Sequence, residues 1–117
     1  MDTLKQTRIR SATRERRVEY RLHYPPELSP TLNVGAQQLQ VLDISENGIR
    51  FVALGQEPAA VGQEFLATIR FQQGGEFCRV VGKVVRVSGC DIGAKLERGF
   101  DFRTIAREHD WIMMHAT

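Results

Sequence analysis

Long apolar runs are missing from this 117-residue sequence, and no stretch approaches the roughly 20 residues that a membrane-spanning helix requires. Residues 1–6 lack the apolar segment of a secretory signal. Cysteine is scarce: only Cys78 and Cys90 occur, without a CxxC pair, so we expect reduced thiols buried on strands and no disulfide framework. These absences predict a cytoplasmic protein without membrane insertion.

Motifs for catalysis and metal binding are also missing. The histidines, His23, His109 and His115, are scattered, and no HExxH, GxSxG or GxxxxGK[ST] pattern occurs. Asp43 and Ser45 lie close in sequence, but no histidine is placed to complete a nucleophile and base. On an extended strand these two side chains would point to the same face, which suits binding. We therefore predict no catalytic residues, no metal ligands and no cofactor.

The composition is that of one globular domain. A chain of 117 residues with 42% hydrophobic residues can bury a single core. Charge is unevenly distributed: residues 1–21 hold seven Lys or Arg against three acidic residues, a net charge of +4, and the remainder carries −2. Few apolar residues occur before residue 16, so residues 1–15 are expected to form a flexible basic arm. An arm of this kind suggests an anionic partner, although a solvated charge run would look the same.

Short alternating segments separated by turn signals fill the rest of the chain. Asn47-Gly48 is the strongest hairpin signal, because both residues tolerate positive φ. Gly74-Gly75 and residues 88–91 indicate two further turns. Gly82 marks a shift of alternation, which predicts a bulge. The expected strands are 18–24, one around Leu39 and Val41, 49–54, 64–71, 77–87 and 92–96.

The chain is expected to end in a helix that plugs an open mouth or covers an edge of the sheet. Asp101 would cap it, with Ile105, Ile112 and Met113 on its packing face. Trp111 would pack on the strands rather than serve as a stacking platform. Several short strands at this spacing predict an all-β barrel or sandwich.

Two short polar segments follow one another in a definite order. Arg17 and Arg21 form an RxxxR motif, and a DxSxxG motif built from Asp43, Ser45 and Gly48 begins 22 residues later. Each motif alone is weak: the arginines fit a solvated face, and the second segment fits a hairpin turn with capping side chains. Their order and spacing together resemble the signature of the PilZ family.

The resemblance covers residues 16–117, which we take as the domain after the 1–15 arm, and it extends through residues 80–86 and 92–96. It implies a six-stranded antiparallel β-barrel with a C-terminal α-helix. It also implies a receptor for cyclic di-GMP without enzymatic activity. The sequence departs from the family at Leu96, where many members have an aromatic residue.

The chemistry of these residue types suits that ligand. Arginine can donate two N–H groups to guanine or phosphate and can stack on a purine. Asp43 can accept from the guanine N1 and N2 donors, Ser45 offers a hydroxyl, and Gly48 permits a tight turn and close approach. By resemblance the ligand-binding residues are Arg16, Arg17, Arg21, Asp43, Ser45 and Gly48. Arg16 directly before RxxxR goes, in this family, with an intercalated ligand dimer.

Several alternatives stay open. The protein could be a small-barrel nucleic-acid-binding protein, which the acidic body and the lack of an aromatic stripe disfavour, so no DNA partner is expected. It could also be a PilZ adaptor that binds protein only. The sequence does not identify the downstream protein partner. It also leaves the direction of Arg50 and Arg86 undetermined, and it gives no defined role to Arg8, Arg10 and Arg14.

Overall fold

The computed structural model describes residues 20–55 and 58–116. It contains strands β2 (Leu22–His23), β3 (Thr31–Val34), β4 (Gln37–Ser45), β5 (Gly48–Val52), β6 (Glu64–Arg70), β7 (Phe77–Ser88) and β8 (Asp91–Arg98). A 3-10 helix, η2 (Pro26–Leu28), follows β2, and helix α1 (Phe102–His115) ends the chain. The predicted arm, residues 1–15, lies outside the described residues.

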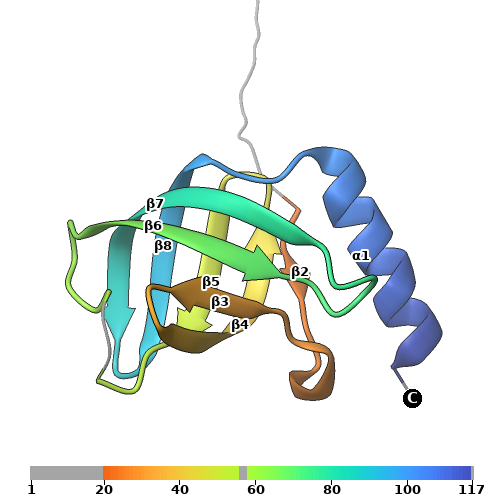
Figure 1. Cartoon of the computed structure of the whole chain (residues 1–117), viewed down its shortest axis with the longest axis horizontal. Coiled ribbons are helices and arrows are strands. Elements are labelled where there is room, and N and C mark those ends of the chain that lie inside the picture. Colours follow the sequence, from red (N-terminus) through yellow and green to blue (C-terminus); the bar gives the residue numbers. More distant parts are fainter. Residues whose placement is uncertain (1–19, 56–57, 117) are drawn as a thin grey trace, which may run out of the picture.

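Six of the strands close into an antiparallel barrel (Figure 1). Hydrogen bonding runs in the order β4-β3-β6-β7-β8-β5, and β5 pairs with β4 to close the ring. The short strand β2 adds to β4 beyond the end of β3, through the pairs Leu22↔Ile44 and His23↔Asp43. The predicted barrel with a C-terminal helix is therefore confirmed.

Apolar side chains at every second position along the strands fill the barrel interior. On β6 and just beyond it Phe65, Ala67, Ile69 and Phe71 are buried, as their period of two predicts, while Leu66 between them is exposed. The Phe51 and Phe65 rings meet edge to face at 5.9 Å in the core.

Turns and bulges occur close to where the sequence places them. Gly74 and Gly75 both have positive φ in the β6–β7 turn. The β7–β8 pairing shifts register between Val81 and Gly82, as predicted, and again between Val84 and Arg86. The expected strand at 18–24 is confirmed for Leu22–His23 among the residues described.

Three sequence predictions were wrong in detail. β3 is not among the expected strands, because it has only four residues and follows Pro30. Its hydrogen bonds come from β4 and β6. Met113 is 68% exposed. Cys78 is half-buried on β7, but Cys90 is exposed at the β7–β8 turn.

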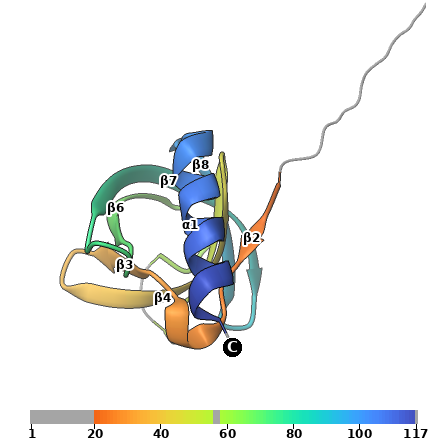
Figure 2. The same ribbon diagram turned by 90° about the vertical axis from the view of Figure 1, so that its right-hand side faces the viewer.

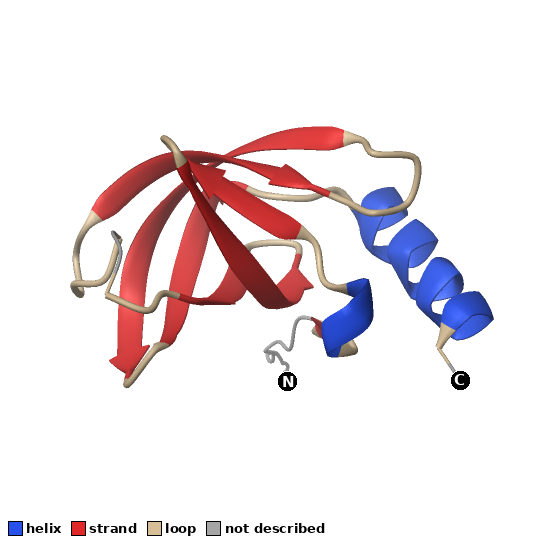
Figure 3. Ribbon diagram, turned by 60° about the horizontal axis from the view of Figure 1, so that its bottom comes forward, coloured by secondary structure: helices blue, strands red, loops and turns tan. Residues whose placement is uncertain are grey.

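Helix α1 lies across one end of the barrel (Figure 2), and Figure 3 shows it in blue beside the red strands. Asp101 caps it, as predicted, by accepting a hydrogen bond from the Thr104 amide at 2.9 Å, which lowers the pKa of Asp101. Ile105 and Ile112 are buried on its inner face. The predicted helix thus covers the barrel mouth.

A buried polar contact fastens the helix to the chain segment that begins with β2. The Tyr24 hydroxyl donates to Glu108 Oε1 at 2.6 Å, and Glu108 is only 1% exposed. Burial raises the pKa of Glu108, an effect that the Tyr24 hydrogen bond partly offsets. The pKa of Tyr24 is raised as well, by burial and then by this hydrogen bond, so the hydroxyl stays protonated.

The raised Glu108 pKa predicts a measurable pH dependence of stability. The favourable effect of a protonated Glu108 is fully present below the unfolded carboxyl pKa of 4.5, and it is lost as pH rises through the raised folded value. Glu108→Gln keeps an acceptor for Tyr24 without a titrating group, so its stability should decline less over that window. Thermal melts from pH 4 to pH 8 test this, with exposed Glu97→Gln as control. Parallel curves for wild type and Glu108→Gln would contradict the prediction.

Candidate functional site

A continuous row of paired residues crosses five neighbouring strands. Direct antiparallel partners connect His23 on β2 to Asp43 on β4, Asp43 to Arg50 on β5, Arg50 to Gly93 on β8, and Gly93 to Arg86 on β7. Residues directly opposite one another in antiparallel strands share a face of the sheet. The register therefore brings residues 23, 43, 50 and 86 to one side of the barrel wall.

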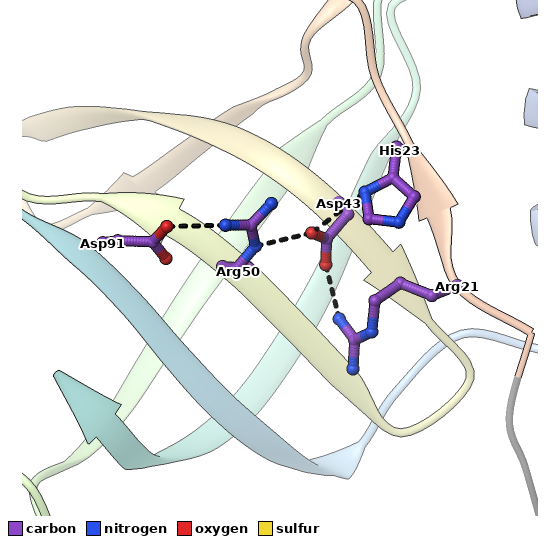
Figure 4. Close-up of polar contacts among 5 residues, drawn as sticks. All are labelled: Arg21, His23, Asp43, Arg50 and Asp91. Atoms are coloured by element: carbon purple, nitrogen blue, oxygen red, sulfur yellow. Dashed lines mark hydrogen bonds and ion pairs between the residues drawn. The ribbon is translucent and has the colours of Figure 1, made fainter. Parts of the chain in front are cut away.

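Asp43 lies at the centre of this row and has no exposed surface. Its Oδ1 accepts a hydrogen bond from Arg21 Nη1, and its Oδ2 accepts one from Arg50 Nε at 2.6 Å (Figure 4). His23 Nδ1 lies 3.5 Å from the same Oδ2. A carboxylate removed from water is stabilised when both oxygens have charged donors, and here the two arginines provide them.

Arg50 continues the network to a second carboxylate. Its Nη1 donates to Asp91 Oδ2 at 2.5 Å, so one guanidinium bridges Asp43 and Asp91 (Figure 4). The hydrogen bond to Asp43 is the largest influence on Arg50 and raises its pKa further. Asp91 Oδ1 is buried and accepts no hydrogen bond within the described part of the chain. Arg50 is thus held rigidly by two acids.

A pocket of about 520 Å³ opens over the row. Three arginines, Arg21, Arg50 and Arg86, contribute to its lining beside Asp43 and Gly93. Such a lining can bind an anion and can also accept from a base donor, because it combines guanidinium groups with a carboxylate.

The structure refines the role of the DxSxxG segment. The β4–β5 turn residues are Glu46 and Asn47, and Gly48 pairs with Ser45 as the first residue of β5. Gly48 does not have positive φ. The hairpin is therefore where it was predicted, but tolerance of positive φ at Gly48 is not what forms it. A Cβ on Gly48 would lie 3.0 Å from Ser45 Oγ and 3.2 Å from Arg21 Nη2. Glycine leaves room here for Arg21 to reach Asp43.

The turn itself is held by the end of β8. The Leu96 amide donates to the Asn47 carbonyl at 2.8 Å, and the Phe100 amide donates to the Glu46 carbonyl at 3.0 Å. Between them Gly99 approaches so closely that an added Cβ would overlap the Glu46 carbonyl oxygen. The turn that positions Ser45 and Gly48 is therefore fixed by backbone contacts distant in sequence.

The strand β2 segment connects the pocket with helix α1, because its side chains alternate between them. Arg21 and His23 face Asp43. On the other side Tyr20 meets the His109 ring edge to face at 6.1 Å, and Tyr24 bonds Glu108. A displacement of β2 at the pocket would therefore reach the helix.

Of the six predicted ligand residues, four are described. Arg21 and Asp43 are brought into direct contact, and Gly48 lies against Arg21. Ser45 is fully buried beside Gly48. Arg16 and Arg17 lie outside the described residues. The sequence left the direction of Arg50 and Arg86 open. It did not predict Asp91, Gly93 or Gly99 as part of the site, because their positions depend on strand register.

Comparison with known proteins identifies the fold and the family. The chain belongs to the PilZ domain family, whose profile matches residues 15–112. This is a family of cyclic di-GMP receptors and adaptors rather than of enzymes. The crystal structure of a Legionella uncharacterized protein, Lpg0364, shares the fold with a TM-score of 0.53 at 13% identity, covering 81% of this chain and 91% of that one. No curated protein matches the sequence.

Two features are absent from the part of the chain that the structure describes. Residues 20–55 and 58–116 contain no helix that is long and apolar enough to span a membrane. The same residues bring together no group of three His, Cys, Asp or Glu side chains suited to a metal ion.

Proposed function

We propose that this domain is a receptor for cyclic di-GMP, which it binds in the pocket over Asp43. The observation that carries the proposal is a carboxylate with no exposed surface, held by Arg21 and Arg50 in the wall of a pocket of about 520 Å³. Guanine offers two N–H donors beside two acceptors, so it needs a carboxylate as well as arginines. An anion-binding surface without a base-reading role would not need Asp43.

Ligand entry requires Arg21 to exchange partners. With Arg21 and Arg50 bound to it, Asp43 has no surface for a base to contact. The Arg21 side chain is 43% exposed and precedes β2, whereas Arg50 is tied to two acids, so Arg21 is the group that can turn from Asp43 toward the ligand. Arg16 and Arg17, by the family resemblance, would then close over the ligand.

We further propose that binding orders residues of the N-terminal arm and changes the surface offered to a protein partner. The alternation of β2 supports this, because Tyr20 and Tyr24 contact α1 on the side opposite Arg21. Ordering the arm has a cost of about 1–2 kcal/mol for each residue fixed, which ligand contacts must offset.

Calorimetric titration of the full chain with cyclic di-GMP tests the function. Wild type should bind, and Arg17→Ala and Arg21→Ala should each weaken binding about tenfold or more, the loss of one good bidentate contact. Arg79→Ala, an exposed arginine of β7 outside the pocket, is the matched control. No binding by folded wild type at about 100 µM ligand would refute the proposal.

The same titration gives the stoichiometry. Arg16 before the RxxxR motif leads us to propose an intercalated dimer, hence two ligands per chain in wild type and fewer in Arg16→Ala. One ligand per chain, unchanged by this substitution, would contradict it.

Two other functions are separated by the same measurements. A nucleic-acid-binding protein would bind an oligonucleotide that competes with cyclic di-GMP, with a strong dependence on salt. A protein-only adaptor would give no heat with the nucleotide. The buried carboxylate of Asp43 within an arginine-lined pocket favours the nucleotide receptor over both.

A further inference from the structure

Arg86 differs from the other two arginines of the pocket. Arg21 is bound to Asp43, and Arg50 is bound to both Asp43 and Asp91. Arg86 makes no ion pair or side-chain hydrogen bond with any residue in the ranges 20–55 and 58–116, and it is exposed. Of these three guanidinium groups, the one most available to a ligand therefore lies outside both sequence motifs.

The strand register places Arg86 on the same face as Asp43. Gly93 pairs with Arg50 on one side and with Arg86 on the other. Adjacent strands are about 4.8 Å apart, so the backbones of Arg50 and Arg86 stand about 10 Å apart with Gly93 between them. Because Gly93 has no side chain, it leaves a gap between the two arginines, and Gly93 and both arginines line the pocket.

The Arg86 side chain lies over this gap. A Cβ built on Gly93 would be 3.6 Å from both Nε and Nη2 of Arg86 and 3.7 Å from its Cβ. These are ordinary contact distances, so the guanidinium covers Gly93 without strain and without a polar partner. A guanidinium in this position can stack on a flat base or donate two N–H groups to a phosphate.

We infer that Arg86, which lies over Gly93, is a ligand contact beyond the two motifs, and that it binds a base or phosphate of the nucleotide through its guanidinium. This inference rests on the proposed function of the same pocket. It assigns distinct tasks to the three arginines. Arg50 positions Asp43, Arg21 exchanges between Asp43 and ligand, and Arg86 is free to contact the ligand directly.

Calorimetric titration of the full chain with cyclic di-GMP tests the inference. Arg86→Ala should bind about tenfold or more weakly. Arg86→Lys should recover only part of that loss, because an ammonium lacks the planar fork. Arg79→Ala on the same strand should bind like wild type. Arg86 is exposed and unpaired among the described residues, so Arg86→Ala should keep the wild-type melting temperature.

The outcomes are distinguishable. Binding by Arg86→Ala within twofold of wild type would overturn this inference and leave the proposed function intact. Full recovery in Arg86→Lys would overturn the assignment to the guanidinium. Absence of binding in folded wild type would overturn the proposed function, and this inference with it.

Discussion

Asp43→Ala is expected to abolish cyclic di-GMP binding and to destabilise the barrel. Asp43 is fully buried and accepts hydrogen bonds from Arg21 and Arg50, so its removal leaves two neighbouring guanidinium groups without their shared carboxylate. Breaking a buried ion pair by removing one partner has a cost of about 3–5 kcal/mol. The Arg21 and Arg50 side chains are 43% and 28% exposed and can turn toward water, so we expect a loss of about 2–3 kcal/mol.

Binding and folding must be measured separately for this variant. Urea denaturation gives the stability, and titration at a temperature where the variant is folded gives the affinity, which should fall at least about 100-fold. Asp43→Asn keeps the side-chain shape and one acceptor oxygen, so it should lose less stability but still bind poorly, since it lacks the charge. Asp110→Ala, with a side chain 82% exposed, is the control. Wild-type affinity in folded Asp43→Asn would show that the carboxylate charge is not needed to bind the guanine of the ligand.

Gly99→Ala is expected to give the largest steric effect in the chain. The added Cβ would overlap the Glu46 carbonyl oxygen and lie 3.0 Å from its carbonyl carbon. Because the obstructing atoms are backbone, no rotamer change can relieve the overlap. The turn is also held by the Leu96 and Phe100 amides, so it cannot move away without losing those hydrogen bonds. Overpacking typically has a cost of 1–3 kcal/mol, and we expect about 3 kcal/mol here.

Thermal melting tests this prediction. A loss of about 3 kcal/mol should lower Tm by more than about 10 °C in a domain of this size. Gly93→Ala on β8 is the matched control, because its Cβ would meet only Arg86 side-chain atoms at 3.6 Å or more and its φ is not positive. A Gly99→Ala variant that melts within about 2 °C of wild type would contradict the packing described for the turn.

The motifs alone indicated many of the site residues, but not the contacts that these residues make with one another. Asp43 and Arg21 were predicted as ligand residues, and the structure shows that they bind each other. Gly48 was predicted from its conformational freedom, whereas the structure requires glycine for the space beside Arg21. Glu108 was missed because a charged residue is not expected on a packing face, and only Tyr24, 84 residues away, explains it.

By itself the sequence determined the class of fold, because local patterns decide it. Alternating apolar residues, three turns, the bulge near Gly82 and the Asp101 cap all act within a few residues of one another, so a barrel with a terminal helix could be predicted. Only the tertiary structure decided which side chains share the pocket. Pairing residues 43, 50, 93 and 86 in one row depends on strand register across the closed barrel, which no local pattern contains. Arg50 and Arg86 both lie outside the two motifs, yet register makes Arg50 a support for Asp43 and places Arg86 in the lining of the same pocket.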